Sequence, residues 1–277
     1  FTEEVTERFV LRRTKEDTNH LKLPPCEIKI NRIPFESSYE QNMYLSVYAD
    51  LKEAITKNKN YALELFLRVR QVCCHPRTYL NGIEKKMSKK IDFPKERSTK
   101  VSKIVESIKK IPSEDKALIF CHFISEMDAY CEALNEEGIT HSRLQGNMNI
   151  SERSESVEYF KSTECRVFVV QINTGGVGYN FQCANWIYIT SPTWNPALQH
   201  QVIGRSHRTG QTKKVYVNVY TIGQGEDVYV EDYITNLQTQ KLKLIAEVLK
   251  DDRICVSSSE AIKFNEIANM FNSCKLS

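Results

Sequence analysis

The stretch Val167-Phe-Val-Val-Gln171-Ile-Asn-Thr174-Gly175-Gly176-Val-Gly178-Tyr-Asn180 decides the fold. Its apolar start, Val167 to Val170, is typical of a strand that is buried on both faces. The glycines that follow allow the backbone to turn tightly beside a ligand, because glycine adopts conformations that other residues avoid. A lone Gly-Gly-x-Gly is more often a plain loop. The stretch therefore predicts a buried strand and a tight turn, and it leaves the presence of a ligand open.

A second strand, a loop and an arginine-bearing segment follow this turn. The strand is Trp186-Ile-Tyr-Ile, and the loop Pro192-Thr-Trp194-Asn-Pro196 leads to Gln201-Val-Ile-Gly-Arg205-Ser-His-Arg208. On a helix, a spacing of three residues places Arg205 and Arg208 on one face. A guanidinium forks two hydrogen bonds onto phosphate oxygens, and arginine fingers stabilise the charge that develops in phosphoryl transfer. The alternative interpretation is a solvated basic helix end.

The order of these elements resembles the second RecA-like lobe of the Swi/Snf-type ATPases, within helicase superfamily two. The segment from Thr193 to Lys213 is similar to the closing motif of that family. The resemblance covers most of residues 9–250, and its further segments are Leu11-Arg-Arg-Thr-Lys15, Leu23-Pro-Pro25, Arg68-Val-Arg-Gln-Val-Cys-Cys-His-Pro76, Ala117-Leu-Ile-Phe-Cys-His-Phe123 and Arg143-Leu-Gln-Gly146-Asn147.

The resemblance implies a nucleotide site that this chain only completes. The sequence contains no Gly-x-x-x-x-Gly-Lys-Ser/Thr and no Asp-Glu-x-His, which belong to the first lobe of the family. ATP with Mg is therefore expected to bind mainly to a first lobe that precedes Phe1. Arg205 and Arg208 are the expected catalytic residues, and the expected nucleotide-binding residues are Gln201, Gly176, Gly178, Arg205 and Arg208.

The resemblance also implies contacts to double-stranded DNA. The expected nucleic-acid-binding residues are Gly146, Asn147, Asn173, Thr174, Gly175 and Trp194. Backbone amides and short polar side chains suit phosphate oxygens. For Trp194, a core tryptophan is an equally weighted alternative. The sequence departs from the family at Gln171-Ile172, at Tyr179, and at Gly204, where an aspartate usually precedes the first arginine.

The alternation of short apolar strands with helices predicts the fold class. Strands are expected near 117–121, 141–144, 167–171, 186–190 and 215–221, with helices opened by Ser125 and Ser151 between them. This pattern favours an α/β fold, a parallel sheet with helices on both faces, and the resemblance implies that this sheet is RecA-like. The expected division is a connector over 1–34, a helical insertion and basic loop over 35–97, the lobe over 98–225, and a C-terminal helical extension over 226–277.

The composition bears on three questions: whether the chain binds nucleic acid, whether it binds a metal, and in which compartment it works. The chain has 277 residues, and its net charge of +3 is too small to indicate nucleic acid by itself. The nine cysteines contain no Cys-x-x-Cys, and Cys73-Cys74-His75 cannot supply a tetrahedral site, so no metal ligands are expected. The basic run Lys85–Lys100 is interpreted as a solvated or flexible loop. No membrane span or signal peptide is visible, which favours a reducing, nuclear location, and a viral source is compatible.

Two other functional classes compete with a duplex DNA translocase. A strand-separating RNA or DNA helicase of superfamily two shares the arginine motif, and a non-catalytic binding module could retain the fold. The segments Leu11–Lys15, Arg70–Pro76 and Trp194-Asn-Pro196 favour the translocase, and retention of Gln201 with both arginines argues against the binding module. The expected partners are double-stranded DNA, the first lobe of the same protein and a chromatin or repair complex.

Overall fold

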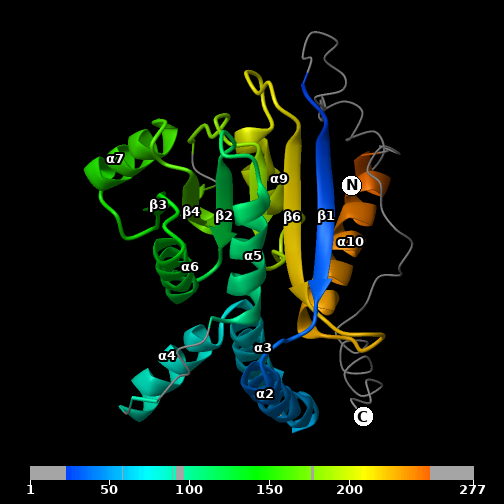
Figure 1. Cartoon of the computed structure of the whole chain (residues 1–277). Coiled ribbons are helices and arrows are strands. Elements are labelled where there is room, and N and C mark those ends of the chain that lie inside the picture. Colours follow the sequence, from blue (N-terminus) through cyan, green and yellow to red (C-terminus); the bar gives the residue numbers. More distant parts are fainter. Residues whose placement is uncertain (1–22, 58, 89, 92–96, 176–177, 250–277) are drawn as a thin grey trace.

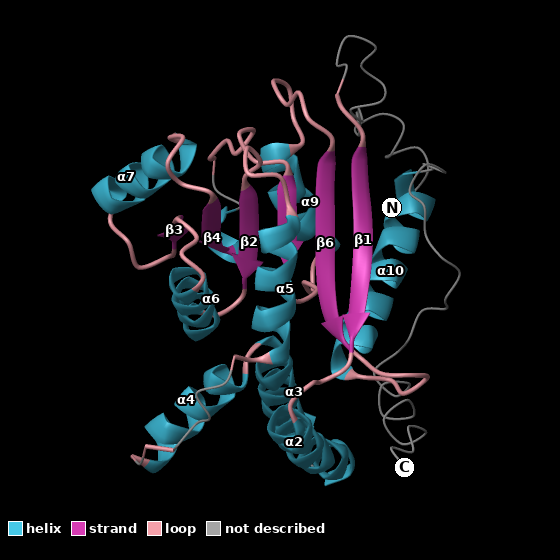
Figure 2. Ribbon diagram, viewed as in Figure 1, coloured by secondary structure: helices cyan, strands magenta, loops and turns pink. Residues whose placement is uncertain are grey.

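A single parallel sheet organises the chain (Figures 1 and 2). The computed structural model describes residues 23–249 apart from 58, 89, 92–96 and 176–177. The six strands lie in the order β1-β6-β5-β2-β4-β3, and every neighbouring pair is parallel. Their bounds are β1 Cys26–Ile33, β2 Ala117–Cys121, β3 His141–Leu144, β4 Val167–Gln171, β5 Trp186–Ile189 and β6 Val215–Ile222.

Helices cover both faces of the sheet and lie beyond the carboxyl ends of its strands. Helices α5 (Thr99–Lys110) and α6 (Ile124–Glu136) pack on one face, and α7 (Ile150–Lys161) and α9 (Pro196–Ser206) pack on the other. Helices α2 (Ser38–Lys57), α3 (Lys59–Cys74) and α4 (Pro76–Met87) lie below the carboxyl ends of the strands in Figure 1. The remaining elements are the four-residue α8 (Ile172–Gly175) and the long α10 (Val230–Leu249).

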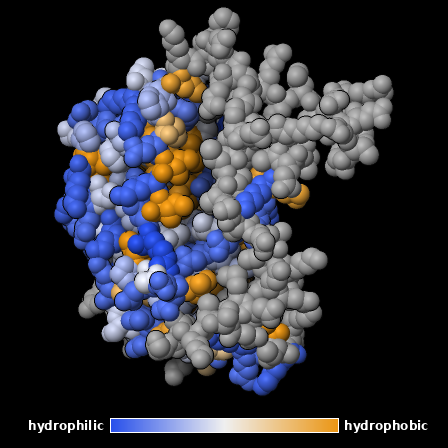
Figure 3. Space-filling view, turned by 90° about the vertical axis from the view of Figure 1, so that its right-hand side faces the viewer, coloured by the Kyte–Doolittle hydropathy of each residue, from blue (hydrophilic) through white to orange (hydrophobic). Residues whose placement is uncertain are grey.

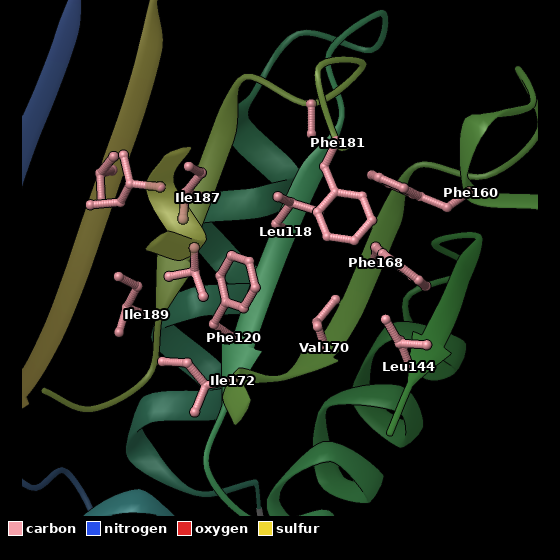
Figure 4. Close-up of a cluster of buried hydrophobic side chains, with 14 of the residues drawn as sticks. Leu118, Phe120, Leu144, Phe160, Phe168, Val170, Ile172, Phe181, Ile187 and Ile189 are labelled. Atoms are coloured by element: carbon pink, nitrogen blue, oxygen red, sulfur yellow. The ribbon is translucent and has the colours of Figure 1, made fainter. Parts of the chain in front are cut away.

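Alternation along the strands divides the core into two layers. Successive side chains of a strand point to opposite faces of the sheet. In β2, Leu118 and Phe120 enter the layer under α7 and α9, whereas Ile119 enters the layer under α5 and α6. Figure 4 shows the first layer, in which Phe160, Phe168 and Phe181 meet. The ring centroids of Phe160 and Phe168 lie 4.7 Å apart in a stacked arrangement.

The predicted fold class is confirmed, and the five predicted strands are present as β2 to β6. The sixth strand, β1, was not predicted: residues 26–33 lie within the segment expected to be a connector. This extended segment pairs with β6 along its whole length, from Cys26 opposite Val215 to Ile33 opposite Ile222. Its partner lies far along the chain, so no local pattern reveals the pairing. Residues 1–22 of the expected connector lie outside the described residues.

Local expectations about helix starts and the basic run need correction. Helix α6 begins at Ile124, and the Ser125 hydroxyl instead bonds Thr78 Oγ1 of α4 at 2.9 Å. Helix α7 is capped by Asn149, whose side chain accepts from Glu152 N at 3.0 Å, so Ser151 is not its cap. The basic run is not wholly solvated, because its last residue, Lys100, is only 1% exposed.

Lys100 forms a buried ion pair that joins elements far apart in the chain. Its Nζ lies 2.7 Å from Oε1 of Glu231, which is fully buried, and it also donates to Thr190 O at 2.6 Å. Glu231 Oε2 accepts from Ile222 N at 2.6 Å. Burial favours the neutral amine, but the charge and hydrogen bonds of Glu231, together with the neighbouring Cys73 and Cys74, outweigh this effect and raise the pKa of Lys100. The pair thus connects α5, the end of β5 and the start of α10.

We expect Lys100→Met to lower the free energy of unfolding by about 3–5 kcal/mol, because it leaves the Glu231 carboxylate buried without its partner. The double variant Lys100→Met/Glu231→Gln should recover part of this loss, since neither site then carries a charge. Urea denaturation of the two variants and the original chain measures both effects. A single variant within about 1 kcal/mol of the original would show that the pair contributes little.

Candidate nucleotide and nucleic-acid sites

Helix α9 crosses one face of the sheet and connects its two ends. The Asn195 side chain caps the helix by accepting from Ala197 N at 3.0 Å, and Pro196 occupies the first turn. Val202 and Ile203 pack into the core. Since α9 follows the carboxyl end of β5 and runs back along the sheet, its last residues lie near the amino ends of the strands. An 11-residue helix rises about 1.5 Å per residue, so these ends lie roughly 16 Å apart.

The last turn of α9 is docked onto the segment that follows the glycine turn. Phe181 N donates to Arg205 O at 2.9 Å, and the Ser206 hydroxyl donates to Phe181 O at 3.2 Å. Arg208 Nη1 donates to the Asn180 side chain. These contacts place Arg205 and Arg208, both half-buried, beside the glycine segment.

The two arginines do not share a helix face, contrary to the sequence prediction. Helix α9 ends at Ser206, and His207 has φ −86° and ψ 78°, which is not helical. Arg208 therefore lies in the turn beyond the helix, where its N–H donates to Ser206 O at 3.1 Å. The contact with Asn180 orients Arg208 in place of the helix. Asn180 was quoted in the sequence only as the end of the glycine stretch, and its contact with Arg208 was not foreseen.

Gln211 holds the arginine segment to the sheet, a role that the sequence analysis missed. Its side chain is 7% exposed, and Nε2 donates to Gln182 O and Ala184 O at 3.0 Å each. Its Oε1 accepts from the backbone N–H groups of residues 212 and 213, both at 3.0 Å. Lys213 also forms an ion pair with Asp115. Burial raises the pKa of this carboxyl, but the hydrogen bonds from Asn185, Lys213 and Trp186 and the charge of Lys213 together outweigh burial and lower it.

The structure gathers most of the residues that were assigned to nucleotide binding. Gln201 is exposed on α9 and lies one turn before Arg205. Gly178 has φ +64°, a left-handed conformation that favours glycine, and it lies two residues before Asn180. Gly176 lies outside the described residues.

A second group of the predicted residues lies at the carboxyl ends of β3 and β4. Gly146 and Asn147 follow β3, whereas Asn173, Thr174 and Gly175 form α8 directly after β4. The side chains of Asn147 and Asn173 are exposed, but that of Thr174 is only 8% exposed. Gln171 Oε1 accepts from Gly146 N at 2.9 Å and so joins the two turns. Gln171 is one of the positions at which the sequence departs from the family.

Trp194 lies after β5, at the same end of the sheet, and it is 38% exposed. Its ring packs against Phe66 of α3 at 5.2 Å between centroids, and the Arg70 guanidinium lies 5.7 Å from its centroid. The side chain is therefore a surface residue with one covered face, and it is not part of the hydrophobic core. The positions assigned to nucleic acid and to nucleotide thus lie at opposite ends of the sheet.

The Cys73-Cys74-His75 cluster has a structural explanation. His75 Nδ1 caps α4 by accepting from Arg77 N at 3.1 Å, and burial lowers the pKa of His75 to about 4. Both cysteines are buried. Within the described ranges, no three His, Cys, Asp or Glu side chains gather as they would around a metal ion. The helices in those ranges include none with the length and apolar character that a membrane span requires.

We expect Gln211→Leu to increase hydrogen exchange in residues 180–184 and 212–213, because it removes the acceptor of two amides and the donor to two carbonyls. Loss of these buried hydrogen bonds should cost about 1–3 kcal/mol of local stability. Exchange measured by mass spectrometry on the isolated chain tests this. Gln224→Leu, an exposed glutamine in the loop after β6, serves as the control. Equal exchange in both variants would contradict the role of Gln211.

Comparison with known proteins supports the fold described above. Residues 99–210 match the helicase conserved C-terminal domain. The solved C-terminal part of the Fun30 ATPase domain aligns with 90% of this chain and 96% of its own, with a TM-score of 0.65. Its sequence identity is 17%, so this likeness supports the fold alone.

Relatives in sequence include proteins from fungi, viruses and bacteria. DNA repair protein RAD5 of Cryptococcus neoformans is 35% identical over 153 residues, which are 53% of this chain and 12% of the relative. The Probable global transactivator of Orgyia pseudotsugata multicapsid polyhedrosis virus is 26% identical over 94% of this chain and 54% of its own length. The Uncharacterized ATP-dependent helicase MG018 of Mycoplasma genitalium is 28% identical over 96% of this chain and 24% of its own.

The chain therefore spans only part of each of these relatives. The domain match and the sequence relatives both point to a helicase, and the parallel sheet is the fold of the similar solved structure. Residues 99–210 are thus similar to the helicase conserved C-terminal domain, and the chain is similar in sequence to RAD5 and to other ATP-dependent helicases of the Swi/Snf type.

Proposed function

We propose that the chain is the second motor lobe of an ATP-dependent translocase on double-stranded DNA, of the chromatin-remodelling or DNA-repair type. The observation that carries the proposal is the docking of the α9 end onto residues 180–184, which orients Arg205 and Arg208 at one end of the sheet. Relatives named as DNA repair proteins and ATP-dependent helicases support the assignment.

The arginine end of the sheet suits the phosphates of ATP held mainly by a first lobe. Two half-buried guanidiniums and the left-handed turn at Gly178 provide positive charge and a close backbone approach. These donors fit phosphate oxygens, whereas the ligands of Mg are carboxylates and hydroxyls, which we assign to the first lobe. ATP supplies the phosphoryl group, and Arg205 and Arg208 are proposed to stabilise its charge during transfer. Gln201 and Gly176 complete the proposed nucleotide contacts.

At the opposite end, DNA phosphates are proposed to contact the turns after β3 and β4. The exposed side chains of Asn147 and Asn173 are the strongest candidates for these contacts. The Gly146 N–H already donates to Gln171 Oε1, so it is not available to a phosphate. Because Gly146 has no side chain, we propose that it lets the DNA backbone approach closely. Thr174 is mostly covered, and Gly175 offers backbone only. Trp194 offers an exposed aromatic face to the groove.

The wider setting follows from the relatives and remains part of the proposal. We place the complete protein in the nucleus, in a chromatin or repair complex, with the first RecA-like lobe as its obligatory partner. Since the proposed site needs both lobes, the isolated chain should hydrolyse no ATP.

The function is tested by joining the chain to its native first lobe and measuring ATP hydrolysis without nucleic acid and with duplex DNA, single-stranded DNA or RNA. We expect duplex DNA to stimulate hydrolysis most, and binding to weaken steeply with salt because phosphate contacts release counterions. Stimulation by RNA alone, or efficient strand separation, would favour a superfamily-two helicase instead.

We expect Arg205→Ala and Arg208→Ala in the two-lobe protein each to abolish most DNA-stimulated hydrolysis. An arginine finger contributes roughly three to five orders of magnitude to the rate of phosphoryl transfer. ATP binding, measured with a fluorescent analogue, should remain largely intact, because the arginines act on the transition state more than on the ground state. Lys213→Ala in the same segment controls for loosening of the loop. Near-normal turnover in both arginine variants would contradict the finger assignment.

A further inference from the structure

Three consecutive carbonyl groups before α9 are each held by a side chain from outside the matched helicase domain. Arg70 Nη2 of α3 donates to Pro192 O at 3.0 Å. Gln238 Nε2 of α10 donates to Thr193 O at 2.7 Å, and Lys241 Nζ donates to Trp194 O at 2.7 Å. We call these three donors and their three acceptors the carbonyl clamp. It joins the helical insertion and the C-terminal helix to the loop that carries Trp194.

Two of the three donors of the clamp, Arg70 and Gln238, are buried. Arg70 is 5% exposed and Gln238 is 9% exposed, so the loss of either hydrogen bond would leave polar groups without water. Arg70 also contacts the His122 ring, with its Nη2 3.0 Å from Nε2. Burial, together with the charge of Arg70, lowers the pKa of His122 to about 3, so the imidazole is neutral beside the guanidinium at physiological pH.

The same helices hold the Trp194 side chain and backbone from two sides. Phe66 and the Arg70 guanidinium of α3 pack against the indole, while α10 binds the backbone through Gln238 and Lys241. Gln238 Nε2 additionally lies 3.0 Å from Thr193 Oγ1. The loop therefore has a fixed orientation although the indole remains partly exposed.

The clamp fixes one end of a rigid element whose other end carries Arg205. Asn195 and Pro196 begin α9 directly after the clamped residues, and the last turn of α9 is docked by Phe181. A helix of this length transmits displacement along its axis because its backbone hydrogen bonds resist bending. A shift of the arginine end on nucleotide binding would thus move Trp194 unless α3 and α10 hold it or move with it.

We propose that Arg70, Gln238 and Lys241 are positioning residues that orient Trp194 toward DNA and couple ATP hydrolysis to translocation. This proposal rests on the proposed function above. The role proposed for the three residues involves no direct contact with ATP or DNA. They act through the carbonyl groups of residues 192–194, so their loss disturbs coupling before it disturbs hydrolysis.

The first test measures Trp194 directly and needs no activity. The chain contains two tryptophans, so in a Trp186→Phe background the fluorescence reports Trp194 alone. Gln238→Leu should increase acrylamide quenching, up to a ceiling of about 2.6-fold if the 38% exposed side chain becomes fully exposed. Thr239→Val on the same helix, whose hydroxyl bonds Thr235 O within α10, is the matched control and should leave quenching unchanged. Unchanged quenching in a folded Gln238→Leu variant would overturn the clamp.

Lys241→Met provides a second variant that should fold, because Lys241 is exposed. It should change quenching in the same direction as Gln238→Leu but by less. If Gln238→Leu unfolds the chain, Lys241→Met alone decides the outcome: increased quenching supports the clamp, and unchanged quenching overturns it.

The second test measures coupling in the two-lobe protein. Gln238→Leu and Lys241→Met should keep DNA-stimulated hydrolysis within about twofold of the original, while translocation measured by triplex displacement falls several-fold per ATP consumed. An equal fall in both activities, or no fall in translocation, would overturn the coupling role. If duplex DNA fails to stimulate the unaltered two-lobe protein, the proposed function fails instead, whereas the quenching result still decides whether the clamp exists.

Discussion

The buried pair of Lys100 and Glu231 is the constraint on which the carboxyl end of the sheet depends. The two residues are 131 positions apart, and neither charge is tolerable in the core without the other. The lysine also fixes Thr190 O, which directly precedes the loop of residues 191–195, and the glutamate fixes the end of β6 through Ile222 N. The orientation of Trp194 and the start of α9 therefore depend on the Lys100–Glu231 pair, although neither Trp194 nor α9 contacts that pair directly.

Two of the segments near the proposed ligand sites, the turn after α9 and the turn after β3, have an irregular backbone. In both, side chains supply the hydrogen-bond partners that regular structure would provide. Gln211 binds carbonyl and amide groups around the arginine turn, and Gln171 binds the Gly146 amide between two strand ends. A buried or turn-forming backbone without such partners would lose free energy for each unpaired group. Glutamine suits this work because its amide both donates and accepts. These residues shape the site without being exposed to a ligand.

Much of the fold was predictable because its signals are local. The apolar runs that became β2, β4 and β5 are short and flanked by turn residues, and they predicted a parallel sheet correctly. Strand β1 was missed because its partner, β6, is non-local. The spacing of the two arginines predicted that Arg205 and Arg208 lie near each other, but it did not predict their arrangement. The helix ends at Ser206, so only Arg205 is helical. Gln238 was not singled out in the sequence, since only the tertiary structure shows that its amide donates to Thr193 O.

The pairing of β1 with β6 has a consequence for how the lobe folds. The earliest described strand completes its ladder only after the last strand of the sheet has been synthesised, which gives the lobe a high contact order and predicts slow closure of that edge. The segment 99–210 that matches the helicase domain contains neither strand and lacks Glu231. A fragment cut to those bounds would expose the flank of β5 to intermolecular strand pairing and leave an uncompensated ammonium in its interior. The autonomous folding unit is thus wider than the conserved domain, and it begins before the helical insertion.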